Sequence, residues 1–95
     1  MVVGVMKVKM RAAWVHSLKE KRMELRSLTS KVSNKYNVSV AEVESQDTHQ
    51  DIVLGVSCVT TDTAHANSIL DNILNYIEAN SEAEIYDYEI EIISF

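Results

Sequence analysis

The sequence predicts an α+β domain of the ferredoxin-like type, in which a split βαβ motif builds a four-stranded antiparallel sheet with two helices on one face. Two observations support this prediction. Six segments show strand-like or helix-like spacing of apolar residues, in the order strand, helix, strand, strand, helix, strand. Right-handed crossovers then place the first and third strands in the centre, with the fourth strand beside the first.

The first predicted strand spans residues 2–11, where apolar side chains alternate with Lys7, Lys9 and Arg11. Such alternation is typical of a strand with one buried face. The short connection that follows contains Trp14. We expect Trp14 to flank the first turn of the next helix, where it either stacks on a base or covers the edge of the core.

The first predicted helix begins at Ser17, because Ser17 followed by Glu20 is a capping-box pattern. A stripe of leucine, valine and tyrosine at helical spacing continues the helix to residues 34–36. The remaining elements follow from the same patterns. They are a strand at 38–44, a polar loop at 45–51, a strand at 52–60 that is apolar on both sides, a helix with its buried stripe at 66–77, and a strand at 85–95.

The last strand brings acids opposite the cations of the first strand. Asp87, Glu89 and Glu91 alternate with Tyr86 and Tyr88, so the two tyrosines have the parity of core-facing residues. A ladder of ion pairs between these acids and the cations of the first strand is therefore the preferred interpretation of the open sheet face. That face lacks the aromatic pair on which RNA-binding sheets stack bases.

The composition is typical of a single folded domain spanning residues 1–95. Hydrophobic residues make up 46% and charged residues 24% of the chain, which argues against disorder. No apolar run is long enough to span a membrane, and the first residues lack a signal-peptide pattern. The single cysteine excludes an internal disulfide framework and favours a reducing compartment. We therefore expect a cytoplasmic protein that makes no membrane contact.

The charges are distributed unevenly along the chain. All nine lysines and arginines lie in residues 1–35 with two acids, a net charge of +7, whereas residues 36–95 carry twelve acids and no Lys or Arg. This asymmetry indicates either a basic binding face or two halves that pair with each other in the folded protein.

The candidate nucleic-acid interface is the basic side of the first helix. No acid lies three or four residues from Lys19, Arg22 or Arg26, and cations in a first helical turn oppose the macrodipole. Lys21 falls inside the apolar stripe, so it either snorkels past the core edge or binds something there. The alternative is a solvated face whose cations pair with acids elsewhere in the fold. The candidate binding residues are Lys19, Lys21, Arg22, Arg26, Lys31 and Lys35.

Catalytic chemistry has little support in the sequence. Cys58 has the parity of buried strand residues, and the three histidines lie in different segments without metal-ligand spacing. Asp47 with His49 is better explained as a turn-forming loop than as an acid–base pair. We therefore expect no metal, no cofactor and no enzymatic activity.

Four motifs resemble the YlxP family of small bacterial proteins. They are Met-Val-Val-Gly-Val at residues 1–5, Ser-Leu-Lys-Glu-Lys-Arg at 17–22, Asn-Val-Ser-Val-Ala-Glu-Val at 37–43, and Gln46-Asp47 with Gln50. The resemblance implies a ferredoxin-like domain of unknown function whose genes neighbour those for transcription elongation, translation initiation and ribosome maturation. Members often carry tryptophan where this chain has His49.

These observations lead to two expectations from different classes of protein. The leading one is a non-enzymatic module that binds structured RNA, such as a ribosomal subunit, through the first helix. The alternative is a protein-interaction or scaffold subunit without nucleic-acid contact, in which the basic helix docks an acidic protein surface or the acidic strand of a second copy. The second strand, an edge strand with no proline or lysine, also favours a homodimer. A small phosphate-ester or acyl-phosphate hydrolase is a third interpretation.

Overall fold

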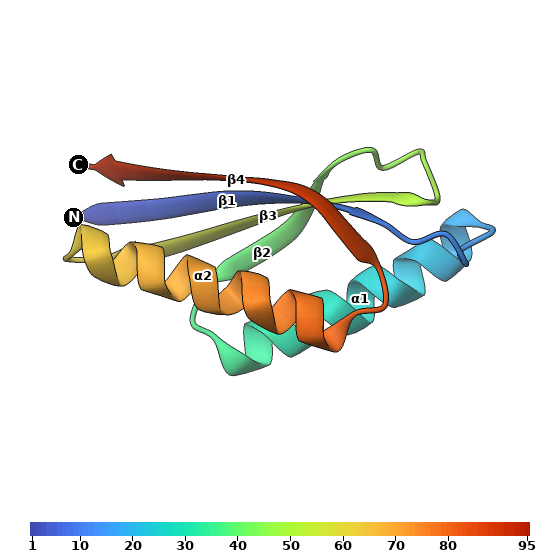
Figure 1. Ribbon diagram of the computed structural model, residues 1–95, viewed down its shortest axis with the longest axis horizontal. Coiled ribbons are helices and arrows are strands. Elements are labelled where there is room, and N and C mark those ends of the chain that lie inside the picture. The colour runs from blue at the N-terminus through green and yellow to red at the C-terminus, as the bar shows by residue number, and fades with distance from the viewer.

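A computed structural model describes residues 1–95 as one sheet with two helices packed against it (Figure 1). All six predicted elements are present, in the predicted order. They are β1 (Val2–Arg11), α1 (Leu18–Lys35), β2 (Ser39–Glu44), β3 (Asp51–Thr60), α2 (Thr63–Asn80) and β4 (Glu84–Ser94).

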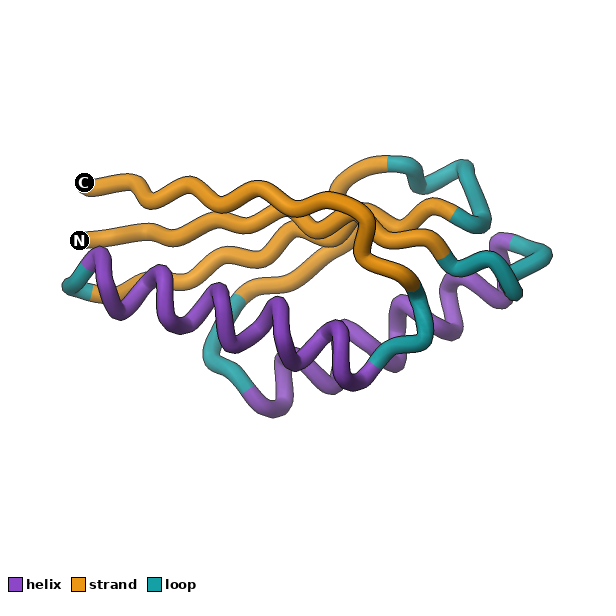
Figure 2. The backbone as a smooth tube through the Cα atoms, in the orientation of Figure 1, coloured by secondary structure: helices purple, strands orange, loops and turns teal.

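The four strands form an antiparallel sheet in the order β2-β3-β1-β4, so β1 and β3 are central. β1 pairs with β3 from Val2↔Thr60 to Arg11↔Asp51, and with β4 on its other side. Both helices lie against the same face of the sheet, and the opposite face is left open (Figure 2). This arrangement confirms the ferredoxin-like α+β fold predicted from the sequence.

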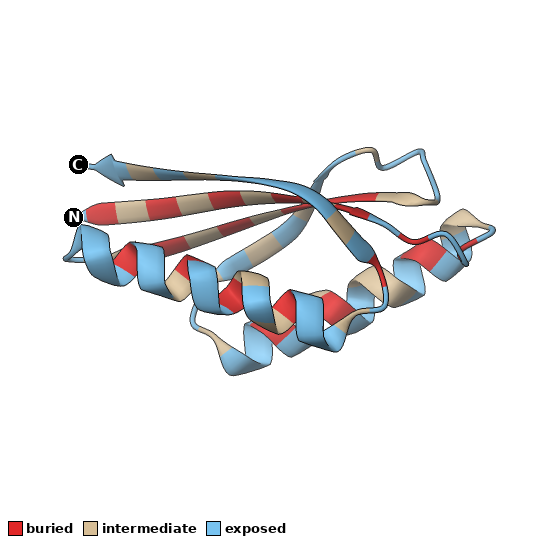
Figure 3. Cartoon of the chain, in the orientation of Figure 1, coloured by how far each residue is buried: buried red, intermediate tan, exposed pale blue.

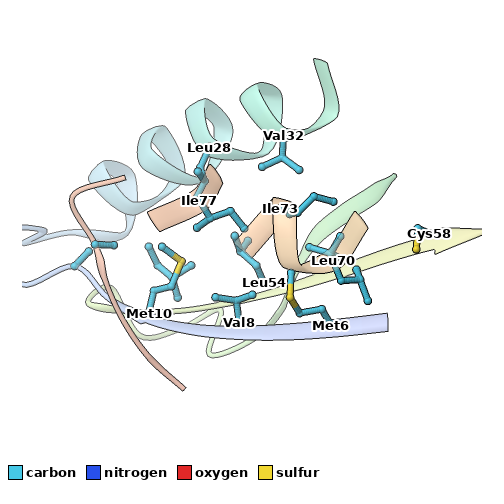
Figure 4. Packing of buried hydrophobic residues seen from close by; sticks show 14 of the residues in the cluster. Met6, Val8, Met10, Leu28, Val32, Leu54, Cys58, Leu70, Ile73 and Ile77 are labelled. Carbon is cyan, nitrogen blue, oxygen red and sulfur yellow. The ribbon is translucent and has the colours of Figure 1, made fainter. Parts of the chain in front are cut away.

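The hydrophobic core lies between the helices and the sheet. Along β1, every second side chain is buried, as the alternating pattern predicts (Figure 3). The buried side chains of β1 and β3 meet those of α1 and α2 in one cluster of 17 residues (Figure 4). Cys58 is part of this cluster and is 3% exposed, in agreement with its predicted role as a small buried side chain.

α2 approaches the sheet closely at Gly4. A Cβ atom at this position would lie 3.0 Å from both Cys58 Sγ and Leu70 Cδ1, and 3.4 Å from the Cβ of Ala66. The space at Gly4 is therefore tight, and a Cβ here would require the Cys58 and Leu70 side chains to shift by a few tenths of an ångström. The N-terminus of α2 is fixed by Asp62, whose side chain accepts a hydrogen bond of 2.7 Å from the backbone N–H of Ala64.

The two tyrosines of β4 are more exposed than their parity predicts. The pairing register shifts between Lys9↔Asp87 and Met10↔Ile85, which leaves Tyr86 as the extra residue of a bulge. Ile85 takes the core-facing position, and Tyr86 is 55% exposed. Tyr88 is paired with the buried Val8 but is 52% exposed, since β4 is an edge strand.

The predicted ion ladder across the open face is only partly correct. The register does bring Lys7 opposite Glu89 and Lys9 opposite Asp87. However, Lys7 Nζ lies 2.7 Å from Glu44 on β2, and none of the ion pairs within 4.0 Å joins β1 to β4. Lys7 thus reaches across β3, where it is paired with Gly55, to an acid of β2.

Candidate nucleic-acid interface

The N-terminus of α1 has the capping geometry that its sequence predicts. Ser17 Oγ accepts a hydrogen bond of 3.1 Å from the backbone N–H of Glu20. The Glu20 carboxylate in turn accepts one of 3.3 Å from the backbone N–H of His16. These two bonds fix where the helix begins, and they therefore also fix the direction in which the following basic side chains point.

Lys21 is a buried structural residue. Its Nζ lies 2.6 Å from the carbonyl oxygens of Ser45 and Thr48 and 2.7 Å from Glu42 Oε2. These three acceptors match the three N–H groups of an ammonium ion. The Lys21 side chain is 2% exposed and that of Glu42 is 19% exposed, and Glu42 Oε2 has no hydrogen-bond partner apart from this ammonium group.

The sequence left open whether Lys21 snorkels or binds something near the core. The structure answers this question, because Lys21 binds acceptors within its own chain. The prediction that Lys21 contacts nucleic acid is therefore wrong, since its ammonium group is fully occupied and removed from solvent. Its partners were not identified from the sequence. They come from β2 and from the β2–β3 loop, which includes Ser45 at a left-handed φ of 60°.

The β2–β3 loop is also joined to the β1–α1 connection. Gln50 Nε2 donates to the carbonyl oxygens of Ala13 at 3.2 Å and Val15 at 3.3 Å, and the backbone N–H of Ala12 donates to the Gln50 carbonyl at 2.8 Å. Together with Lys21, these contacts hold the loop against the N-terminal end of α1. Two of the sequence motifs, residues 17–22 and 46–50, thus meet in one structural unit.

Three cations form an exposed row on one flank of α1. At 100° per residue, Arg22, Arg26 and Lys19 project within a sector of about 60°, next to the buried stripe and turned away from α2. All three are exposed, and none of the ion pairs in the structure includes them. We call this set the basic row of α1.

Lys31 and Lys35 lie on the other flank of α1, which faces α2. Lys31 lines a shallow pocket of about 380 Å³ together with Trp14, Glu24 and the C-terminal end of α2. Lys35 Nζ is 5.1 Å from the ring centroid of Tyr76 on α2. The six cations predicted as one binding surface are therefore divided into the buried Lys21, the basic row and these two residues.

Trp14 does not flank the first turn of α1, as its place in the sequence suggested. It is 37% exposed and shares its pocket with Glu24, Ser27 and Lys31, which lie beyond the first turn of α1. The indole thus lies on the flank that faces α2 and is separated from the basic row by the width of the helix.

The open sheet face holds an exposed ion pair. The hydrogen bond and the charge of Glu44 raise the pKa of Lys7, and the same contact with Lys7 lowers the pKa of Glu44. Arg11 Nη1 is 4.0 Å from Asp51, and Arg11 Nη2 donates to Gln50 at 3.3 Å. The cations of β1 are therefore engaged with acids or amides of β2, β3 and the loop between them, with the exception of Lys9.

No group of three or more His, Cys, Asp and Glu side chains is arranged to hold a metal ion. Neither helix is long and apolar enough to cross a membrane. Three exposed features stand out in the structure, namely the basic row of α1, the open sheet face and the free strand edges.

Comparisons with known proteins identify the family and support the fold. The family model described as "Protein of unknown function (DUF503)" matches residues 3–90. The uncharacterized protein YlxP of Bacillus subtilis (strain 168) is 37% identical over 68 residues, which are 72% of this chain and 74% of YlxP. The chain belongs to the DUF503 family, to which the motifs in its sequence had pointed.

Two solved structures are similar to this chain. A de novo designed protein with a ferredoxin fold, LFR1 1, superposes with a TM-score of 0.51 and 18% identity, over 98% of this chain and 84% of that one. SnoaB, a cofactor-independent oxygenase from Streptomyces nogalater, gives a TM-score of 0.46 and 11% identity, over 99% and 92% of the two chains. The first of these likenesses supports the fold, and neither assigns an activity to this chain.

Proposed function

We propose that this protein binds structured RNA, such as that of a ribosomal subunit, through the basic row of α1, and that it acts by binding and not by catalysis. The observation that supports the proposal is the exposure of Lys19, Arg22 and Arg26 on one flank without a carboxylate partner. The only fully buried cation of the helix, Lys21, is the one that has found internal acceptors.

The spacing of the basic row suits phosphate contacts. Residues 19, 22 and 26 follow one another at three and four residues, so they rise along one side of the helix by about 5 Å per step. Long, mobile cations in such a line can follow a nucleic-acid backbone without reading its bases. The net charge of −5 opposes non-specific binding elsewhere on the surface, which would confine RNA to this flank.

The test compares the two flanks of the same helix. Arg22→Glu with Arg26→Glu reverses two charges on the basic row, and Lys31→Glu with Lys35→Glu makes the same change on the flank that faces α2. Co-sedimentation with ribosomal subunits should be lost in the first variant and largely kept in the second. Equal binding by the wild type and the Arg22/Arg26 variant, both folded by circular dichroism, would exclude the proposal.

The alternative is a protein-interaction or scaffold role without nucleic-acid contact. It is favoured by β2, an edge strand that exposes Ser39, Ala41 and Val43 and carries neither lysine nor proline. A pull-down with and without nuclease separates the two functions. Partners that disappear on nuclease treatment favour RNA, whereas partners that remain favour protein contact.

A further inference from the structure

The β4 edge of the sheet, which lies opposite the β2 edge, has features of a second binding surface. β4 is an edge strand of 11 residues that pairs only with β1, so the backbone groups along its outer side are free. Asp87 and Glu89 are paired with Lys9 and Lys7, whose side chains lie on the open face, and Glu91 is paired with Val5 in the same register. Paired residues project to the same face, so the three acids form a column along this edge.

A groove lies beside this edge, between β4 and α2. It has a volume of about 550 Å³. Its apolar part includes Leu74 and Ile85, together with Tyr86 and Tyr88, each about half exposed. The remaining residues of its lining are Glu78, Ala83, Glu84 and Asp87. The bulge makes the ring of Tyr86 available, because it displaces this side chain from the core, and the edge position of β4 does the same for Tyr88.

The two elements that line this edge and its groove, α2 and β4, carry acids and no Lys or Arg, whereas Lys7, Lys9 and Arg11 lie opposite on β1. Residues 36–95 contain no lysine or arginine, so neither α2 nor β4 contributes a cation. The acids of the groove and of the column take no part in any ion pair within 4.0 Å. Lys7, the cation opposite Glu89, is instead bound to Glu44 at 2.7 Å. The outer edge therefore carries acids that no cation holds within 4.0 Å, beside two accessible aromatic rings.

We propose that the β4 edge binds an extended, basic segment of another protein, which adds to the sheet as a fifth strand. Alternate side chains of an added strand point to opposite faces. Its lysines or arginines would lie over the open face beside Asp87, Glu89 and Glu91, and its apolar side chains would enter the groove beside Tyr88. This surface is distinct from the basic row of α1, so the inference does not depend on the proposed function.

A second copy of this chain does not fit the edge. Every lysine and arginine of the chain lies in β1, in α1 or at their ends. β1 is paired on both sides, and α1 is a helix, so neither can supply a free basic strand. Two β4 edges would bring two acidic columns together, and β2, the other free edge, carries Glu42 and Glu44 and no cation, so neither edge of a second copy complements the charge of β4. The partner is therefore a segment from a different protein.

The experiment uses the full chain and a short, fluorescently labelled peptide of alternating lysine and valine. Anisotropy should show saturable binding that weakens with salt. Glu89→Lys with Glu91→Lys should weaken binding by about tenfold or more. Asp47→Lys, which reverses an exposed acid in the β2–β3 loop, should leave binding nearly unchanged. A peptide with the same side chains but N-methylated backbone amides should bind poorly, because it cannot pair with a strand edge.

Several results would overturn this inference. One is that a glutamate–valine peptide, or the N-methylated peptide, binds as tightly as the lysine–valine peptide. Another is that the Asp47→Lys variant loses as much affinity for the lysine–valine peptide as the Glu89→Lys, Glu91→Lys variant does. Self-association of the protein alone that is abolished by Glu89→Lys with Glu91→Lys would show that a second copy occupies the edge. Amide exchange by NMR provides the positive result, namely new protection along 87–93 when the peptide binds.

Discussion

Two lysine–glutamate pairs in this protein have the same length and different surroundings. Lys21 with Glu42 and Lys7 with Glu44 are both 2.7 Å apart, and both use a glutamate of β2. The side chains of the first pair are 2% and 19% exposed, and those of the second are 39% and 50% exposed. Burial, and not distance, therefore determines what each pair does.

The buried pair organises the fold locally, whereas the exposed pair is replaceable. Water has no place beside the Lys21 ammonium group, because its other two N–H groups donate to carbonyl oxygens of the β2–β3 loop. An exposed pair gains little, because water and salt screen its charges. This difference indicates which cations are available to a partner, since a cation engaged inside the protein cannot also bind phosphate.

The largest expected effect is that of removing the buried ammonium group. Lys21→Met leaves Glu42 without its counter-charge and frees the loop carbonyls, and breaking a buried pair in this way destabilises a protein by roughly 3–5 kcal/mol. Urea unfolding followed by circular dichroism measures the loss. Lys7→Met is the matched control and should change the unfolding midpoint far less. Equal losses in the two variants would contradict the comparison.

Removing both charges of the buried pair should destabilise the protein less than removing the lysine alone. Lys21→Met combined with Glu42→Leu leaves no unpaired buried charge, so we expect it to recover roughly 1–3 kcal/mol of the loss. A double-mutant cycle measures this coupling. A double variant that is less stable than Lys21→Met alone would show that the Glu42 carboxylate has a second stabilising role.

The basic row should weaken the stability of the helix. Lys19 lies in the first turn of α1, where a cation opposes the macrodipole, so Lys19→Glu should raise the free energy of unfolding by roughly 0.3–1 kcal/mol per charge. Lys35→Glu, in the last turn, should lower it. Thermal unfolding at low salt gives both values. A loss of stability in Lys19→Glu would indicate that Lys19 makes a stabilising contact within its own chain.

The smallest expected effect is the pH dependence that arises from the exposed pair. Glu44 has a lowered pKa, so its contribution is present at neutral pH and is lost as the pH falls through that pKa. Lys7 has a raised pKa, so its contribution is lost as the pH rises through that value. An NMR titration of the Glu44 carboxyl group should show its pKa rising in Lys7→Met. An unchanged pKa would mean that the pair does not persist in solution.

The sequence was sufficient to predict the fold because each element has a clear local pattern. Alternation in β1, the Ser17–Glu20 cap and the apolar stripe of α2 are all encoded by neighbouring residues. The environment of Lys21 is not local. Its acceptors come from residues 42–48, and they converge only when the loop turns at Ser45 with a left-handed φ.

The exposure of Tyr86 was missed for a similar reason. Parity along a strand assumes an unbroken register, and the bulge at Tyr86 changes that register without a glycine or proline to signal it. The contact of Lys7 with Glu44 likewise joins two strands, β1 and β2, that are separated by β3. Interactions of this kind require the assembled sheet.

The central claim is that α1 carries one structural cation and an exposed row that binds a polyanion. The most direct test is the salt dependence of RNA binding, measured for the wild type and for Arg22→Glu with Arg26→Glu. Three phosphate contacts predict that log K falls with log salt at a slope of about −2 to −3 for the wild type, and at a much shallower slope for the variant. The same steep slope in both proteins would contradict the account.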